Sequence, residues 1–201
     1  MNISQLMGSL CLAACAAAAG AQTAADFSQR DISQRDINQE TRIRNGLQDG
    51  SLTTREAAVL ERKEGRFDRL QEQALRDGKL SDAERARINR AEDRVSADIR
   101  NARHNGVQGD PLSASSQRMQ QGVQRDIQQQ QRIQDGLQSG QLSNREVAGL
   151  ERGQARQDAR QFRAGRDGHV SGHEAQAIDN AQNASSQRIH QLRHNASPSP
   201  Q

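Results

Sequence analysis

Residues 35–62, RDINQETRIRNGLQDGSLTTREAAVLER, and residues 125–152, RDIQQQQRIQDGLQSGQLSNREVAGLER, are two versions of one sequence. They belong to a longer alignment in which residues 35–105 match residues 125–195 at a constant offset of 90, with 33 identities in 71 positions and no gap. Self-similarity of this kind indicates an internal duplication. Between the copies, NGVQGDPLSASS at 105–116 contains Gly, Pro and Ser and is typical of a linker.

A short turn motif recurs inside each copy. The pattern Gly-x-(Leu/Val)-(Ser/Thr)-x-x-Glu begins at Gly50, Gly78, Gly140 and Gly168. Between the turns, apolar residues recur every three or four positions, which places them on one helix face. No stretch alternates with a period of two residues. We therefore predict an all-α protein made of two duplicated three-helix units, which are joined by a Gly/Pro/Ser linker and contain six helices in total.

The turn motif resembles the second half of a calcium-binding EF-hand loop. If Gly50 takes loop position 6, Glu56 takes position 12, but Leu47 takes position 3 and offers no side-chain oxygen. Turn chemistry explains the same residues without metal: the glycine ends one helix, the Ser or Thr caps the next, and the Glu closes a capping box. We favour helix caps and keep weak calcium binding as the alternative. Its candidate ligands are Asp135, Glu146, Asp167 and Glu174.

The histidines give a second candidate metal site. His190 and His194 are four residues apart on the last predicted helix, so both imidazoles lie on one face at a spacing that suits copper, nickel or zinc. A solvated surface pair is the other interpretation. His169 and His173 flank the fourth turn, and about 20 helical residues span roughly 30 Å, so we do not expect a single four-histidine site.

The N-terminus is predicted to be an export signal. The stretch from Leu6 to Ala19 is uncharged and rich in small and apolar residues, and small residues precede a cleavage site after Ala21. In an alternative interpretation, Leu12 to Cys15 is a lipobox and Cys15 carries a lipid anchor. We predict a periplasmic or secreted protein with no transmembrane span after processing. Both cysteines lie in this segment, so the mature chain has no disulfide.

Composition argues against several classes of function. The chain has no Trp or Tyr and a net charge of +3, and arginines alternate with acids along the sequence instead of forming a basic block. Nucleic-acid binding is therefore not expected. The mature chain has no cysteine and no Gly-rich phosphate loop, and its many Asp and Glu are assigned to solvated helix faces. We expect no catalysis and no obligatory cofactor.

The predicted organisation of the chain follows from these features. It consists of a signal peptide (1–21), an N-terminal flank (22–34), repeat unit 1 (35–105), a linker with a helix start (106–124), repeat unit 2 (125–195) and a disordered tail (196–201).

The four turns and the closing Arg-His-Asn of each copy resemble a group of exported bacterial helical-repeat proteins, some of which are described as EF-hand-like. More distantly, the chain is similar to small periplasmic helical stress proteins with Leu-Thr-x-x-Gln turns. The resemblance covers nearly the whole predicted mature chain but implies no established activity. We predict an exported, non-catalytic protein that has an envelope interaction or stress-related binding role, with an unknown protein or envelope partner and possible self-association. Metal binding is the alternative function.

Overall fold

The computed structural model describes residues 19–195, and no strand occurs in this range. The helices are α1 (Ala19–Asp49), α2 (Thr54–Leu75), α3 (Asp82–Arg103), α4 (Ala114–Gln138), α5 (Asn144–Gly165) and α6 (Gly172–Arg193). The predictions of an all-α fold and of six helices are confirmed for the described residues. The bounds of α5 and α6 lie 90 residues after those of α2 and α3, as 144 − 54 and 172 − 82 show.

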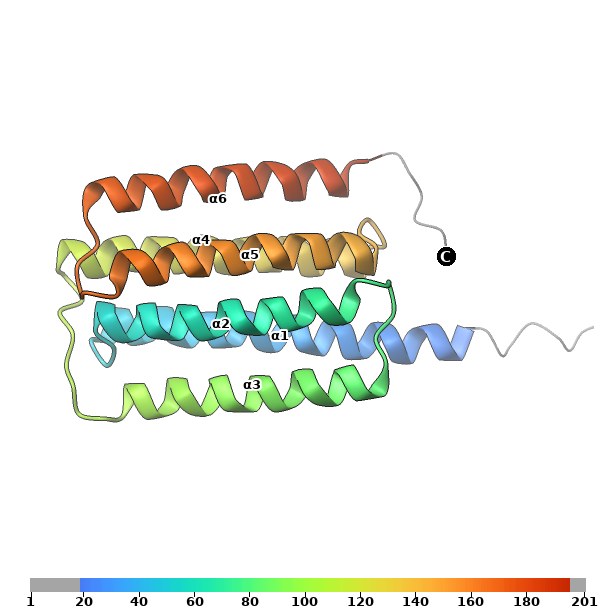
Figure 1. The fold of residues 1–201 in the computed structure, drawn as a ribbon, viewed down its shortest axis with the longest axis horizontal. Helices are drawn as coiled ribbons and strands as arrows, with labels where there is room; N and C mark the ends of the chain where they lie inside the picture. Colours follow the sequence, from blue (N-terminus) through green and yellow to red (C-terminus); the bar gives the residue numbers. More distant parts are fainter. Residues whose placement is uncertain (1–18, 196–201) are drawn as a thin grey trace, which may run out of the picture.

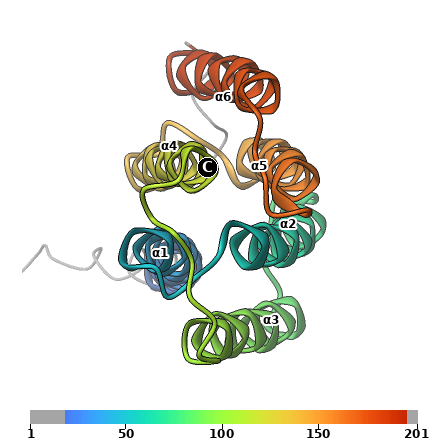
Figure 2. The ribbon, with the colours of Figure 1, turned by 90° about the vertical axis from the view of Figure 1, so that its left-hand side faces the viewer.

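Four helices form the centre of the molecule. α2 lies beside α5 and α1 lies beside α4, while α3 packs on α1 and α2 and α6 packs on α4 and α5 (Figures 1 and 2). Successive helices run in opposite directions along one long axis (Figure 1). The inner faces of α1, α2, α4 and α5 therefore enclose one shared interior.

Apolar side chains gather at both ends of this interior. One cluster joins the α1–α2 turn, through Leu47 and Leu52, to Met119 at the start of α4 and Ala164 at the end of α5. A second cluster joins Leu75 at the end of α2 to the α4–α5 turn and the end of α6. The middle turns of the central helices lie between these clusters, and there the interior is largely polar.

The recurring motif forms the predicted turns. Gly50, Gly78, Gly140 and Gly168 have φ angles between 72° and 90°, a left-handed conformation that glycine adopts without a Cβ clash. α2, α3, α5 and α6 each begin with a complete capping box. The predicted helix caps are therefore confirmed.

Loss of one cap is expected to destabilise the protein moderately. The Ser143 hydroxyl accepts a hydrogen bond from the Glu146 N–H, and Ser143→Ala leaves that N–H without its partner. We expect a loss of about 1 kcal/mol in the free energy of unfolding, measured by chemical denaturation. Ser143→Thr keeps the acceptor, as Thr53 does at the start of α2, and should stay close to wild type. Equal losses in both variants would contradict the capping explanation.

Two predicted segments fall beyond the described residues. The disordered tail at 196–201 lies outside them entirely, and the signal peptide at 1–21 lies outside them except for its last three residues. Among the described helices, none is both long and apolar enough to cross a membrane.

Candidate metal centre

The predicted loop ligands take part in the turns. Oε2 of Glu146 accepts hydrogen bonds from the backbone N–H and the hydroxyl of Ser143, at 2.9 and 2.7 Å. Glu174 does the same with Ser171. Asp167 Oδ1 accepts the His169 backbone N–H at 2.9 Å, and the Asp135 side chain is exposed. Calcium binding at these four residues remains a prediction, but one oxygen of each Glu already serves a helix cap.

The predicted histidine pair lies at the C-terminal end of α6. The rings of His190 and His194 lie 4.1 Å apart between centroids, and His194 Nδ1 is 2.8 Å from the His190 carbonyl oxygen. Both side chains are exposed. His169 lies at the opposite end of α6, where its Nδ1 is 3.0 Å from the Ser115 hydroxyl. The structure therefore brings His190 and His194 together and keeps His169 apart from them.

A second group of acids lies in the polar middle of the interior. Each of its members is less than 4% exposed. They come from α1, α2, α4 and α5, and we call them the carboxylate cluster: Asp36, Glu40, Glu61, Glu64, Asp68, Asp126, Glu151 and Asp158. The expectation that the helical acids lie on solvated faces is wrong for these eight residues.

Helical spacing explains why these acids point inward. On α1, Asp36 and Glu40 precede Ile43 and Leu47 at steps of four, three and four residues, so they continue the same inward stripe. On α2, the acids at 61, 64 and 68 occupy the stripe that ends with Leu75. Packing of the apolar ends therefore forces the carboxyl groups into the interior.

No ion pair neutralises the cluster. Within residues 31–195 no Arg or Lys is buried, and none of the eight carboxylates has a basic nitrogen within 4.0 Å. Two other buried acids differ: Glu92 pairs with Arg35 at 2.7 Å and Glu72 pairs with Arg152 at 2.5 Å, both at the edge of the interior. Buried charges of one sign without a counterion are unfavourable.

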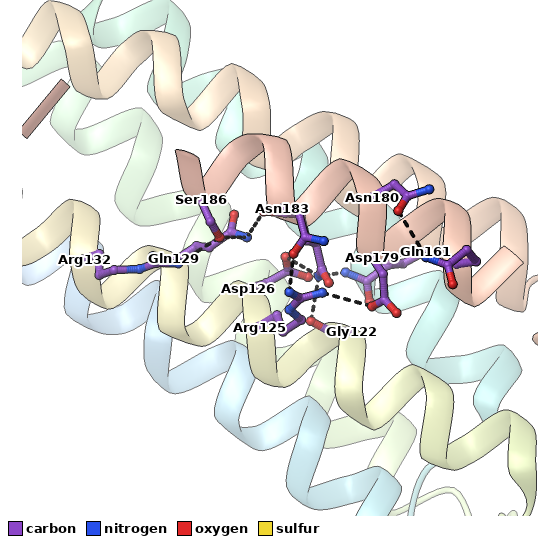
Figure 3. A network of polar contacts seen from close by, with 12 residues as sticks. Gly122, Arg125, Asp126, Gln129, Arg132, Gln161, Asp179, Asn180, Asn183 and Ser186 are labelled. Atoms are coloured by element: carbon purple, nitrogen blue, oxygen red, sulfur yellow. Dashed lines mark hydrogen bonds and ion pairs between the residues drawn. The ribbon is translucent and has the colours of Figure 1, made fainter. Parts of the chain in front are cut away.

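Glutamines supply hydrogen bonds to part of the cluster. Gln130 Nε2 donates to Asp36 Oδ2 at 2.7 Å and to Glu151 Oε2 at 3.0 Å. Asp126 accepts from Gln161 and, at 2.9 Å, from Gln182. Figure 3 shows this second network, in which Asp126 and Gln129 of α4 face α6. These amides act as neutral donors where a cation would otherwise be expected.

Other carboxylates of the cluster have no such donor. Both carboxylate oxygens of Glu61 and both of Glu64 lack a hydrogen-bond partner, as do Oε2 of Glu40 and Oδ2 of Asp158. An unsatisfied buried polar atom is costly, so a concentration of them in one place calls for a physical explanation.

Two sets of three carboxylates have the spacing of metal ligands. One oxygen from each of Glu40, Glu61 and Asp158 lies within 4.8 Å of the others, and we call this set the open triad. Asp36, Asp68 and Glu151 form a second set with the same spacing. A glycine permits this approach of α2 to α5, because a Cβ on Gly65 would lie 3.0 Å from the Asp158 Cβ.

Burial shifts the protonation of the cluster. Desolvation raises the pKa of Asp126 and of Glu151 to about 7, although hydrogen bonds from glutamines oppose the shift in both. For Glu61, desolvation and then the neighbouring charges of Glu40 and Asp126 raise the pKa well above its usual value. The pKa of Asp158 is raised in the same way, first by desolvation and then by Glu61. Because burial raises these pKa values, protons neutralise the carboxyls at a higher pH than in an exposed acid.

No protein-family model, curated protein or solved structure matches this chain.

Proposed function

We propose that this chain is a non-catalytic, exported protein that binds a hard divalent cation at the open triad. The ligands come from both halves of the alignment: Glu40 and Glu61 from the first and Asp158 from the second. In this proposal the halves are duplicated three-helix units that face each other across α2 and α5. The matching bounds of their helices and the gapless alignment support that arrangement.

The observation that carries the proposal is a comparison inside the molecule. Glu40 aligns with Gln130 (130 − 40 = 90), and Glu61 and Asp158 align with Glu151 and Asp68. Gln130 lies beside Asp36 and Glu151 of the second set, and its amide N–H groups donate hydrogen bonds to both of these carboxylates. In the open triad, a third carboxylate takes the place of the amide, and four of the six carboxylate oxygens lack any donor. A cation supplies the positive charge that this arrangement lacks.

The ligand chemistry favours calcium or manganese. All donors are carboxylate oxygens, which suit hard cations, whereas zinc and copper prefer nitrogen and sulfur. Oxygens separated by up to 4.8 Å fit around an ion with metal–oxygen distances of about 2.4 Å, within the usual range for calcium. Each carboxylate supplies one oxygen at this spacing, and a carboxylate that binds through both oxygens supplies a second, so the three residues can provide three to six of the oxygens that calcium needs.

Calorimetric titration of the chelator-treated full-length protein with calcium and then with manganese tests the proposal. We expect saturable binding at about pH 8, because burial raises the pKa of all three carboxyls and fewer protons compete with the cation there than at acidic pH. Glu61→Gln removes one charged ligand, keeps the side-chain shape, and should abolish binding. The thermal melting temperature should rise with the same cation in wild type only.

Matched variants separate this centre from the other candidates. Asp135→Asn removes an exposed acid of the predicted calcium loop, and His190→Ala breaks the histidine pair. Both should bind calcium or manganese as wild type does. If neither cation binds to wild type, or if Glu61→Gln binds as well as wild type, the proposal is wrong.

A further inference from the structure

On α2 and α5 the basic residues lie on the outside of the molecule and most of the acids lie in the interior, although acids and bases are interspersed in the sequence. The two helices contain ten basic residues, five in each, and none of them is buried. Six of their eight acids are buried, which leaves only Glu56 and Glu146 near the surface, where both close capping boxes. The outer surface of this helix pair thus carries ten bases against two acids.

The basic residues of each helix form a row. On α2, Arg55, Arg62, Arg66 and Arg69 recur at steps of seven, four and three residues, so they share one face. On α5 the steps from Arg145 are seven, four, four and three. We call the two rows together the arginine face: Arg55, Arg62, Arg66, Arg69, Arg145, Arg152, Arg156, Arg160 and Arg163.

Most of this face has no anionic partner in the described chain. Only Arg152 makes an ion pair, with Glu72. Arg55 and Arg145 donate to the carbonyls of Asp167 and Asp77, and Arg62 lies 4.5 Å above the Phe162 ring. Exposed guanidinium groups in this number repel one another and present many free donors for phosphate.

We propose that the arginine face docks on a membrane surface rich in anionic phospholipids. The partner is identified by its charge and its shape. Two antiparallel helices of 22 residues lie side by side, so the rows extend over roughly 33 Å of length. A sheet of phosphate headgroups can contact both rows at once, and juxtamembrane basic residues bind such surfaces electrostatically.

The same geometry disfavours nucleic acid. A major groove about 12 Å wide admits one helix, and this face consists of two. Binding of single strands usually relies on exposed aromatic rings, whereas within residues 31–195 Phe67 is buried and Phe162 lies beneath Arg62. Within residues 31–195 the large exposed apolar side chains are Val107 and Leu112, in the α3–α4 connection, and Val107 lies beside Arg55 at one end of the arginine face. Contact through the rest of the face is therefore electrostatic. Docking of the arginine face on a membrane does not depend on a cation at the open triad.

Vesicle sedimentation of the full-length protein tests this inference. The probes are vesicles of phosphatidylcholine alone and vesicles of equal parts phosphatidylcholine and phosphatidylglycerol. We expect binding to the anionic vesicles only, and its loss at high salt. A variant with Arg66, Arg156, Arg160 and Arg163 changed to Gln should bind at least tenfold more weakly, since each basic residue at an anionic surface contributes severalfold.

The matched control changes the same number of exposed arginines on α3: Arg87, Arg90, Arg94 and Arg100. This variant has the same net charge as the first and should keep most of the vesicle binding. Equal losses in both variants would show an effect of net charge alone and overturn the inference. Absence of binding to anionic vesicles would overturn it as well, and binding of a short DNA duplex in its place would point to nucleic acid.

Discussion

The chelated protein is expected to be more stable at about pH 5 than at about pH 8, the reverse of the behaviour of a protein held by surface ion pairs. The cause is the carboxylate cluster. Desolvation raises the pKa of all eight members, and for Asp126 and Glu151 the value is about 7. Ionising them in the folded chain places several negative charges in one unpaired interior.

The direction follows from proton binding. An acid whose pKa is raised by folding keeps its proton in the native state while the unfolded chain releases it. For Asp126 and Glu151 the free energy of unfolding therefore falls as pH rises from about 4 to about 7. The other six members, whose pKa values burial also raises, change the stability in the same direction. Glu72 behaves oppositely, because the hydrogen bond from Arg152 lowers its pKa, and its contribution is lost only as pH falls below about 4. The free energy of unfolding of the chelated protein should therefore be highest near pH 5.

Thermal melts with chelator across this range measure the effect. Calcium or manganese should raise the melting temperature at about pH 8 and have little effect at about pH 5, because protons compete for the same oxygens. If the stability of the chelated protein does not change between pH 5 and pH 8, or rises, folding does not raise the pKa values of the cluster and the prediction is wrong.

Replacement of Glu61 by leucine is expected to stabilise the metal-free protein while removing the proposed cation site. Neither oxygen of Glu61 has a hydrogen-bond partner, and its side chain is fully buried. An apolar residue of similar volume removes an uncompensated charge, so we expect a gain of about 1 to 4 kcal/mol in the free energy of unfolding at about pH 8. The gain should shrink at about pH 5, where the carboxyl is protonated.

The aligned residue Glu151 provides the control for this variant. Its Oε2 accepts a hydrogen bond from the Gln130 amide, so Glu151→Leu leaves one N–H of that amide without an acceptor while the other still donates to Asp36. The gain should be smaller than for Glu61→Leu, or absent. Chemical denaturation of the chelated proteins gives both values. A loss of stability in Glu61→Leu would show that the Glu61 carboxylate is compensated and would contradict the argument for a cation.

The elements of local origin could be predicted from the sequence. α2 and α3 begin one residue after Thr53 and Ser81, because the capping chemistry is contained within four neighbouring residues. The apolar stripe of α3 is likewise a local pattern, and its Ile88, Val95 and Ile99 are buried as the spacing requires. Such features do not depend on which other helices lie nearby.

The carboxylate cluster could not be predicted in the same way, because its members come from four helices that only the tertiary arrangement brings together. The sequence contained one signal of the cluster. On α2 the acids at 61, 64 and 68 are separated by three and four residues, and the last of them lies seven residues before the core residue Leu75, so all four share one helix face. An acid on an apolar stripe usually marks the edge of a core. Gln157, aligned with the core residue Phe67, shows the same ambiguity, since it is buried and bonds to Gln129 and Gln154.

The position of the open triad would give a cation bound there a mechanical role. Two of its ligands belong to the first half of the chain and one to the second, so an ion held there ties α1 and α2 to α5. The predicted mature chain has no cysteine with which to make such a link covalently. A cation would act as a removable cross-link between these helices. The link would form when the ion binds, and acid or a competing chelator would remove it.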